Sequence, residues 1–521
     1  MNLTKALGSV GGLTLASRVL GLVRDSLFVR FVGAGFASDA FLLAFRLPNM
    51  FRALFAEGAF ASAFIPMFNK KVADKEGPGL PAGIAFARDA LSVLFPVLIA
   101  MTVLVELAAY PVAWVLWGST RGVTDAQFAY VVELCRLTFP YLMLISLVSL
   151  LGGILNSLHK FWVNAAAPIL LNLTLIVALL VFHTNPLGTS RNQAIAVSVS
   201  GVLQLAWLWW ACHRAGVRLF PGRPRMNADV KRFLSLLWPA AAGTSAVQIN
   251  LVVSSALARS LLAAGSVTYI YTADRVNQLP LGLIGIGLGT VLLPLISRQL
   301  GEGDDAGAMT TQNRGMELAL LLTLPATVAL VVCGAPIVAA LFEHGKFGAA
   351  DTALTAQALA AFSVGLPSYI LVKVLTPGFY ARADTKTPVR YATMSMVVNL
   401  LLNLALIVPL KHMGPPLATA LASSLNVFLL YRTLRIRGHF EPDQRLRRRA
   451  WRLALAAVAM GVVLWLLQGW LMPYTHGDWL ARTAAMTVLV AAGGLVYAVA
   501  TFVLGAFSRD DLAFLRRKRA R

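Results

Sequence analysis

Ten charged side chains interrupt stretches of this sequence that are otherwise apolar enough to cross a lipid bilayer. They comprise six basic and four acidic residues: Arg18, Arg24, Arg46, Arg52, Arg275, Lys373, Asp25, Asp39, Glu57 and Asp274. A charged side chain near the bilayer centre costs at least ~2.5–3.5 kcal/mol, so such residues usually face a bundle interior or water and mark a pathway. The set is net positive, and the planar fork of arginine matches phosphate. It therefore predicts a cavity for an anion.

The spacing and number of these charges suggest which residues bind substrate and which have supporting roles. In the first apolar stretch, residues 10–32, Arg18 and Asp25 are seven residues apart and share a helical face. The sequence holds too few intramembrane carboxylates to pair every arginine, so some arginines are predicted to bind substrate: Arg18, Arg24, Arg52 and Arg275. The remaining charges are candidates for supporting or gating roles: Asp25, Asp39, Arg46, Glu57, Asp274 and Lys373.

A structural role is the alternative for several of these charges. Asp25 and Asp274 fit buried ion pairs that hold a neighbouring arginine, and Glu57 is able to neutralise one arginine of its helix. Asp39 lies near a helix end and fits an anchor at the membrane interface. We interpret Asp384, in the stretch ARADTKTP (381–388), as a loop or helix-cap residue, with an ion-coupling role as its alternative.

The composition places these residues in a polytopic membrane protein. The chain has 521 residues, 58% hydrophobic and 13% charged, with a mean hydropathy of +0.71. Its fold class is therefore predicted to be an all-α polytopic membrane protein of about 14 transmembrane helices. The predicted spans are residues 10–32, 36–67, 84–117, 128–157, 161–183, 191–213, 232–262, 267–299, 315–342, 352–381, 387–409, 413–435, 450–472 and 480–506.

The distribution of lysine and arginine predicts the orientation of these helices. If the N-terminus is cytoplasmic, the inside segments include 69–77, 213–232, 381–390, 431–452 and the tail 516–521, which hold most of the basic residues. This pattern follows the positive-inside rule and places both termini in the cytoplasm. The net charge of +22 therefore reflects topology and contact with membrane lipids, and we expect no nucleic acid partner.

Sequence motifs for enzymatic chemistry are missing. Cys135, Cys212 and Cys333 lie far apart, and the histidines form no metal-ligand pattern, so no metal site is predicted. The sequence contains no phosphate-binding loop, no nucleophile elbow and no DDxxD pattern. We therefore expect a membrane transporter and not an enzyme, with no catalytic residue and no cofactor.

The two halves of the chain resemble each other. AFRLPNMF (44–51) precedes FIPMF (64–68), and ADRVNQLP (273–280) precedes LLPLI (292–296) at a similar distance. We predict a lobe of six helices at 1–215, a second lobe of six helices at 216–440, and a C-terminal helix pair with a basic tail at 441–521. Two such lobes around a cavity are typical of transporters, whose substrate sites lie between the repeats.

Several long and polar motifs resemble one known family. They are SRVLGLVRD (17–25), GAGFASDAFLLAFRLPNMFRALFAEGAFASAFIP (33–66), ADRVNQLPLGLIGIGLGTVLLP (273–294), LFEHGKF (341–347) and VLTPGFYARADTKTP (374–388). Together they resemble the MurJ (MviN) family of lipid II flippases, of the superfamily that includes the MATE exporters. The resemblance extends over essentially the whole chain and implies a MATE-like arrangement of the two lobes.

The resemblance implies a function and assigns residues to it. The family moves lipid II, an undecaprenyl-diphosphate-linked peptidoglycan precursor, from the inner to the outer leaflet of the bacterial cytoplasmic membrane by alternating access. The family's essential cavity arginines match Arg18, Arg24, Arg52 and Arg275, and Asp39 and Lys373 also stand at matching positions. The chain departs from some members at Gln278, where those carry glutamate. This departure puts in doubt any gating role for a carboxylate there.

The same resemblance implies the partners and an energy source. Lipid II, membrane lipids and the cell-wall synthesis machinery are the expected partners. A diphosphate carries roughly two negative charges, and each is worth ~2.3 kcal/mol per 100 mV of membrane potential. With the cytoplasm negative, the potential favours outward movement of the anion, so no ATPase module is required. The sequence leaves open a coupling ion and the oligomeric state.

Two functions of other classes remain open on the sequence alone. One is a cation-coupled multidrug exporter of the MATE type, which needs buried carboxylates and aromatic residues, whereas the charges here are net basic. The other is a non-transport role, either as an enzyme of polyprenyl-lipid metabolism or as a scaffold of cell-wall synthesis. A scaffold would tolerate the loss of the cavity arginines.

Overall fold

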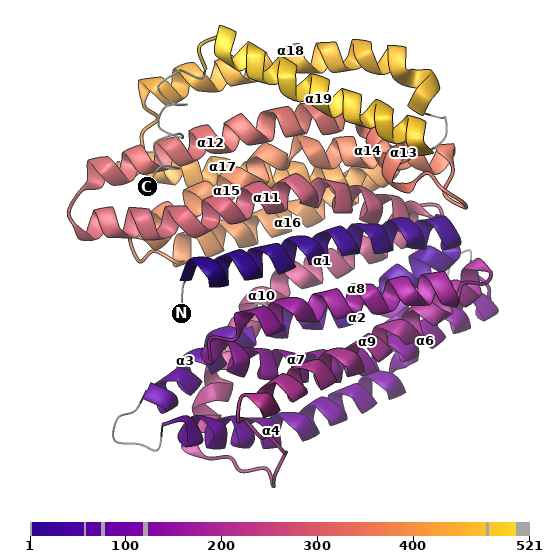
Figure 1. Cartoon of the computed structure of the whole chain (residues 1–521), viewed down its shortest axis with the longest axis vertical. Helices are drawn as coiled ribbons and strands as arrows, with labels where there is room; N and C mark the ends of the chain where they lie inside the picture. The colour runs from indigo at the N-terminus through magenta and orange to yellow at the C-terminus, as the bar shows by residue number, and fades with distance from the viewer. Residues whose placement is uncertain (1–2, 57–58, 74–78, 118–122, 476–478, 507–521) are drawn as a thin grey trace. The chain divides into compact units, whose positions relative to one another are not determined.

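The computed structural model of the chain describes residues 3–56, 59–73, 79–117, 123–475 and 479–506. Over these residues the backbone forms nineteen α-helices and one short 3₁₀ helix, and no strand (Figure 1). Ten helical stretches in this part of the chain are long and apolar enough to cross a membrane. The predicted all-α, multi-pass membrane fold is therefore confirmed, whereas the count of fourteen transmembrane helices stays a prediction.

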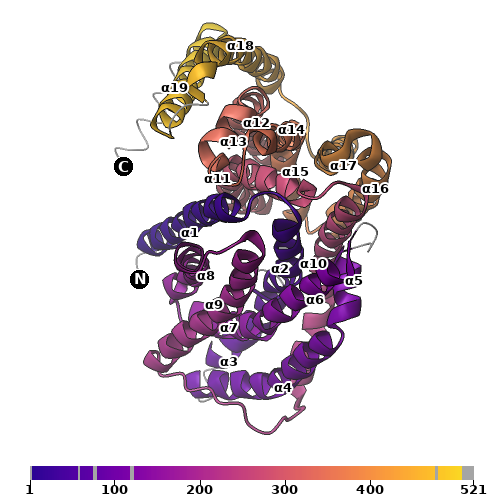
Figure 2. The same cartoon turned by 90° about the vertical axis from the view of Figure 1, so that its right-hand side faces the viewer.

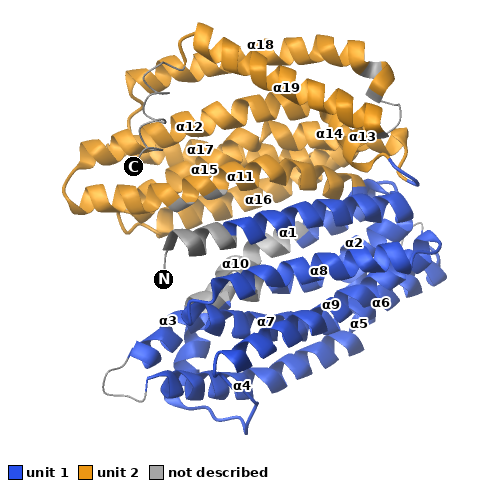
Figure 3. Cartoon of the chain, viewed as in Figure 1, with its two compact units in different colours: residues 1–268, 344–346 blue, residues 269–343, 347–521 orange. Residues whose placement is uncertain are grey.

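The chain divides into two compact units, drawn in separate colours in Figure 3. Unit 1 comprises residues 1–268 with 344–346, and unit 2 comprises residues 269–343 with 347–521. The lobe boundaries at residues 215 and 440 were predicted from a sequence repeat, whereas the two units are defined by contacts within the structure. The predicted lobe boundaries therefore stay predictions.

Unit 1 is built from the first ten helices. They are α1 (Leu3–Val32), α2 (Phe36–Ala56), α3 (Ala59–Ala73), α4 (Leu80–Leu107), α5 (Ala109–Trp117), α6 (Asp125–Thr138), α7 (Pro140–Ser157), α8 (Phe161–Val181), α9 (Pro186–Arg214) and α10 (Ala228–Leu261). Helix α1 packs along α8, and α10 packs against α2, α3 and α5. Phenylalanine rings fill the core between α3, α4 and α10: Phe64 and Phe86 stack 5.5 Å apart, and Phe233 meets both in an edge-on arrangement. This packing fixes α1 and α2, the two helices that carry most of the predicted site residues of this unit.

Unit 2 is built from the helices that follow. They are α11 (Ser266–Gly301), α12 (Asp305–Val332), α13 (Gly334–Phe342), α14 (Ala349–Val364), α15 (Leu366–Tyr380), α16 (Lys386–Leu410), η1 (Lys411–Met413), α17 (Gly414–Ile436), α18 (Gln444–Thr475) and α19 (Trp479–Val503). The first turn of α11 belongs to unit 1, because the boundary follows Thr268. The apolar stretch Lys386–Ile436 contains two of the predicted spans, since η1 connects α16 to α17 and the two helices pack side by side.

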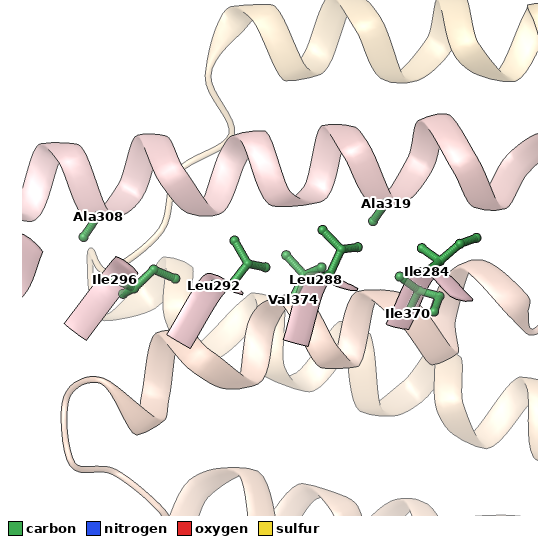
Figure 4. Packing of buried hydrophobic residues seen from close by; sticks show 8 residues of the cluster. All are labelled: Ile284, Leu288, Leu292, Ile296, Ala308, Ala319, Ile370 and Val374. Carbon is green, nitrogen blue, oxygen red and sulfur yellow. The ribbon is translucent and has the colours of Figure 1, made fainter. Parts of the chain in front are cut away.

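A stripe of apolar side chains holds α11 between α12 and α15. Four residues of α11 recur at every fourth position and therefore share one face: Ile284, Leu288, Leu292 and Ile296. They contact Ala308 and Ala319 of α12 and Ile370 and Val374 of α15, as Figure 4 shows. All eight side chains are buried, so they fix the two helices that carry Arg275 and Lys373 within unit 2.

An ion-pair network attaches the beginning of α18 to α12. Glu317 of α12 is buried and accepts hydrogen bonds from Arg314, at 2.5 Å, and from Arg449. Asp443 pairs with Arg314 and caps α18, because its Oδ1 accepts the Leu446 N–H at 2.6 Å. The burial of Glu317 is explained by its partner on α18, Arg449, which lies more than a hundred residues away in sequence.

The motif LFEHGKF forms the connection from α13 to α14, and its centre packs on the end of α1. The Lys346 N–H donates to the Arg30 carbonyl at 2.9 Å. Gly345 has a φ of +62°, and a Cβ atom there would lie 2.4 Å from the Arg30 carbonyl oxygen. Only glycine therefore fits this position, both for its backbone conformation and for the space available.

Gly345→Ala is expected to destabilise unit 1. The substitution forces a left-handed residue and a steric overlap with Arg30, which together cost about 2–4 kcal/mol. We expect a clearly lower melting midpoint of the purified protein in detergent. Gly348→Ala, in the same connection but with no atom within 4 Å of an added Cβ, is the matched control. Equal midpoints for the two variants would contradict the close packing at Gly345.

Candidate functional site

Arg24 of α1 is a predicted substrate-binding residue whose guanidinium is held from two helices. Its side chain is buried beside that of Asp25, and its Nε and Nη2 atoms donate to Asp25 Oδ1 at 3.0 and 2.6 Å. Its Nη1 donates to Asn172 Oδ1 of α8 at 3.2 Å, while Asn172 Nδ2 donates to the Ser17 carbonyl at 2.9 Å. The ion pair expected for Asp25 is therefore present, and Asn172 fixes the guanidinium from a second helix.

The other predicted site residues of unit 1 are less enclosed. Arg18 is exposed on α1, whereas Arg46 and Arg52 of α2 are half-buried. The Arg52 Nε donates to Asn49 Oδ1 at 3.0 Å, one turn earlier on the same helix. Glu57 lies outside the described residues. Arg18 is thus the most accessible of these cations, and Arg52 is oriented by a neutral amide.

Asp39 is buried and caps the start of α11. Its Oδ2 accepts the Gly265 N–H at 2.7 Å, and its Oδ1 accepts the Thr268 N–H at 2.9 Å and the Thr268 hydroxyl at 2.7 Å. A carboxylate at a helix N-terminus is favoured by the helix dipole and satisfies N–H groups that have no partner within the helix. The interpretation of Asp39 as an anchor at the membrane interface was therefore wrong. Its partners lie 226 and 229 residues away in sequence.

In unit 2, α11 carries Asp274 and Arg275 with partners one turn away. The Tyr271 hydroxyl accepts hydrogen bonds from Arg275 Nε, at 3.0 Å, and Arg275 Nη2, at 2.6 Å. Gln278 Nε2 donates to Asp274 Oδ2 at 2.5 Å. Tyr271 thus orients the guanidinium of Arg275, and Gln278 provides Asp274 with a neutral partner.

Lys373 of α15 lies against α11 at a glycine. A Cβ atom on Gly285 would be 2.8 Å from Lys373 Nζ and 3.1 Å from its Cδ. The missing side chain therefore makes room for the lysine beside the α11 backbone. Gly285 thus permits close contact between α11 and α15.

Asp384 caps α16, as the sequence predicted. Its Oδ1 accepts the Thr387 N–H at 3.0 Å, and its Oδ2 accepts the Thr387 hydroxyl at 2.6 Å and Arg437 Nη1 at 2.7 Å. The Thr387 hydroxyl and the Arg437 guanidinium hold the pKa of the Asp384 carboxyl well below its usual range. These bonds account for Asp384 in structural terms, and its ion-coupling role stays a prediction.

Sequence reasoning missed the residues that orient the two arginines. Asn172 is an amide within the apolar span 161–183, and Tyr271 stands four residues before Arg275. Both positions carried a usable signal: Asn172 is a polar amide in an apolar helix, and Tyr271 stands one helical turn before a cation within a predicted span.

The geometry supports recognition of an anion. Arg24, Arg52 and Arg275 are each oriented by an oxygen acceptor, which keeps the guanidinium plane fixed for a phosphate. Among the described residues, no three His, Cys, Asp or Glu side chains are grouped so as to hold a metal ion. The roles assigned to these residues in substrate binding and gating stay predictions.

Two solved structures have a fold similar to that of this chain. A structure described as lipid II flippase MurJ in an inward closed conformation aligns with a TM-score of 0.77 at 23% identity, covering 95% of this chain and 98% of that one. An inward-facing multidrug resistance MATE family transporter of the MOP superfamily aligns with a TM-score of 0.66 at 16% identity, covering 81% and 95% of the two chains. At these identities the likeness establishes the fold alone.

Sequence comparisons are more specific. The family model described as lipid II flippase MurJ matches residues 28–485. A probable lipid II flippase MurJ of Rhizobium tropici is 40% identical over 99% of this chain and 96% of the relative. The lipid II flippase MurJ of Burkholderia cenocepacia is 36% identical over 85% and 86% of the two chains. Matches of this extent and identity show that the chain is a member of the lipid II flippase MurJ family.

Proposed function

We propose that this protein translocates lipid II from the inner to the outer leaflet of the bacterial cytoplasmic membrane by alternating access. Membership of the MurJ family carries this proposal, and its relatives are named as flippases, which are transporters and not enzymes. The oriented arginines on α1 and α11, of which Arg24 is buried and Arg275 half-buried, support it, since lipid II bears a diphosphate. Lipid II is the proposed substrate, and the cell-wall synthesis machinery is a further proposed partner.

The proposed architecture extends the fold described above. Two lobes of six helices, at 1–215 and 216–440, enclose a cationic cavity, and the helices of 441–521 complete a set of fourteen. Both termini lie in the cytoplasm, in agreement with the basic segments there. The cavity binds the diphosphate through Arg18, Arg24, Arg52 and Arg275, with Lys373 beside them.

The proposed energy source is the membrane potential. Two negative charges moving outward through 100 mV gain roughly 4.6 kcal/mol, which drives export without nucleotide hydrolysis. The ten intramembrane charges predicted to form the site sum to +2, from six cations and four carboxylates, so a dianion brings the loaded cavity close to neutrality. Reduced translocation after collapse of the potential is the corresponding expectation.

Depletion of the protein in its native bacterium tests the function directly. We expect labelled lipid II to accumulate in the inner leaflet, where an externally added enzyme cannot reach it. Normal delivery of the precursor to the outer leaflet in depleted cells would exclude the flippase function. A cationic dye retained equally by depleted and normal cells would argue against the MATE-type exporter.

Asn172→Ala is expected to slow lipid II translocation by about tenfold or more, because a hydrogen bond to a charged group contributes roughly 1.5–3 kcal/mol. The substitution removes the contact that holds Arg24 Nη1 from α8. Translocation is measured in vesicles at equal protein content. Asn192→Ala is the matched control, since the Asn192 amide donates only to a backbone carbonyl, that of Phe182. Full activity of the Asn172 variant would show that Arg24 needs no support from α8.

A further inference from the structure

The linker between α9 and α10, residues 215–227, is held in a defined path although most of it is exposed. Val217 and Leu219 are buried, and the Gly222 N–H donates to the Ser92 hydroxyl of α4 at 2.8 Å. Asn227, which caps α10, also donates to Asp89 Oδ2 of α4 at 2.7 Å. Figure 2 shows the linker passing beneath α4 on its way to α10. Its outward side chains are therefore presented at fixed positions.

These outward side chains form a strongly basic surface. Arg218, Arg223 and Arg225 are exposed, and Arg88 of α4 lies beside Gly222, 3.5 Å from where its Cβ would be. No described carboxylate is within ion-pair distance of these four arginines. The two nearby acids are already engaged, Asp89 by Asn227 and Asp229 by Lys71 at 2.8 Å. The four positive charges are therefore available for an external anion.

Exposed aromatic rings lie beside this basic surface. Phe220, at the centre of the linker, is 59% exposed, and its ring meets the edge of the exposed Trp209 ring at 5.8 Å. The Arg214 guanidinium lies 4.8 Å over Trp210, one residue further along α9. Exposed tryptophans beside cations at the end of an apolar helix are typical of the membrane interface, where rings contact chains and cations contact phosphates.

We propose that Arg88, Arg218, Arg223 and Arg225 form a binding site for the phosphate groups of anionic phospholipids, with Phe220 packed among the upper parts of the acyl chains. The arginine fork suits a phosphate diester, and no acidic residue of the linker opposes it. An exposed phenylalanine continuous with the tryptophans of α9 favours a lipid surface over an acidic protein. This site goes beyond the proposed transport function and is independent of the charges within α1, α2 and α11.

Native mass spectrometry of the full chain, released from micelles with equal phosphatidylcholine and phosphatidylglycerol, tests the site. The variant R218Q/R223Q/R225Q is compared with R390Q/R432Q/R435Q, which loses the same charge from exposed positions on α16 and α17. Each basic residue near an anionic surface contributes roughly a fivefold preference. We expect the preference for phosphatidylglycerol over phosphatidylcholine to fall at least about tenfold in the linker variant. In the control variant this preference is expected to stay within about twofold of the wild-type value.

Two results would overturn the proposal. One is a linker variant that retains phosphatidylglycerol as wild type does. The other is an equal loss in both triple variants, which would indicate only the general attraction of basic segments. An unchanged melting midpoint in phosphatidylcholine and unchanged labelling of an introduced cysteine from the cytoplasmic side verify folding and orientation. Phe220→Ser serves as a second variant, expected to weaken retention without any change of charge.

Discussion

Replacing Arg24 with alanine is expected to stop lipid II translocation, with a loss of roughly 10²-fold or more, while the protein still reaches the membrane. Arg24 is buried and held by Asp25 and Asn172, so its guanidinium is already oriented before substrate arrives. An oriented cation in a site of low dielectric binds phosphate more strongly than a mobile surface arginine. Translocation and membrane abundance are measured on the same vesicles.

The buried ion pair requires a control, because the alanine variant also leaves Asp25 without its main partner. Removing one member of such a pair costs about 3–5 kcal/mol, whereas replacing both members is often close to neutral. The double variant R24M/D25N therefore separates the two roles of Arg24. If Arg24 binds substrate, this variant stays inactive at normal abundance. Recovery of translocation would show that Arg24 serves only to neutralise Asp25.

Much of the fold was predictable because membrane helices must satisfy every backbone group internally. Apolar length alone therefore identified the helical stretches, including the two joined in Lys386–Ile436. Helix ends depend on local chemistry, and Asp384 was recognised as a cap from the residues beside it. The burial of Glu317 was not predictable in this way, because it depends on Arg449 and on the packing of α18 against α12.

In the candidate site, too, contacts between sequence neighbours were predictable, whereas contacts between residues distant in sequence were not. The pairing of Asp25 with the adjacent Arg24 follows from sequence proximity and is present. The role of Asp39 was misread, because its partners at Gly265 and Thr268 become neighbours only in the folded chain. Asn172 was overlooked for the same reason, since it meets Arg24 only where α1 and α8 pack. The sequence therefore predicted the contact between adjacent residues and missed the partners that are distant in sequence.

Arg275→Ala is expected to reduce translocation as severely as Arg24→Ala, and Tyr271→Phe is expected to reduce it by about tenfold. The Tyr271 hydroxyl accepts two N–H groups of Arg275, so phenylalanine keeps the ring but releases the guanidinium. The charge stays in place in the tyrosine variant, and only its orientation is lost. Binding of lipid II to the purified protein is measured together with the rate of translocation.

The comparison of these two variants distinguishes positioning from direct contact. If Tyr271 only orients Arg275, its substitution lowers the affinity for lipid II in the wild-type background. The same substitution has no further effect when Arg275 is already replaced by alanine. The double variant Y271F/R275A should therefore behave as R275A alone. Tyr380→Phe, at an exposed tyrosine on the end of α15, controls for the loss of a hydroxyl. If Tyr271→Phe lowers activity further in the R275A background, then Tyr271 acts on lipid II independently of Arg275.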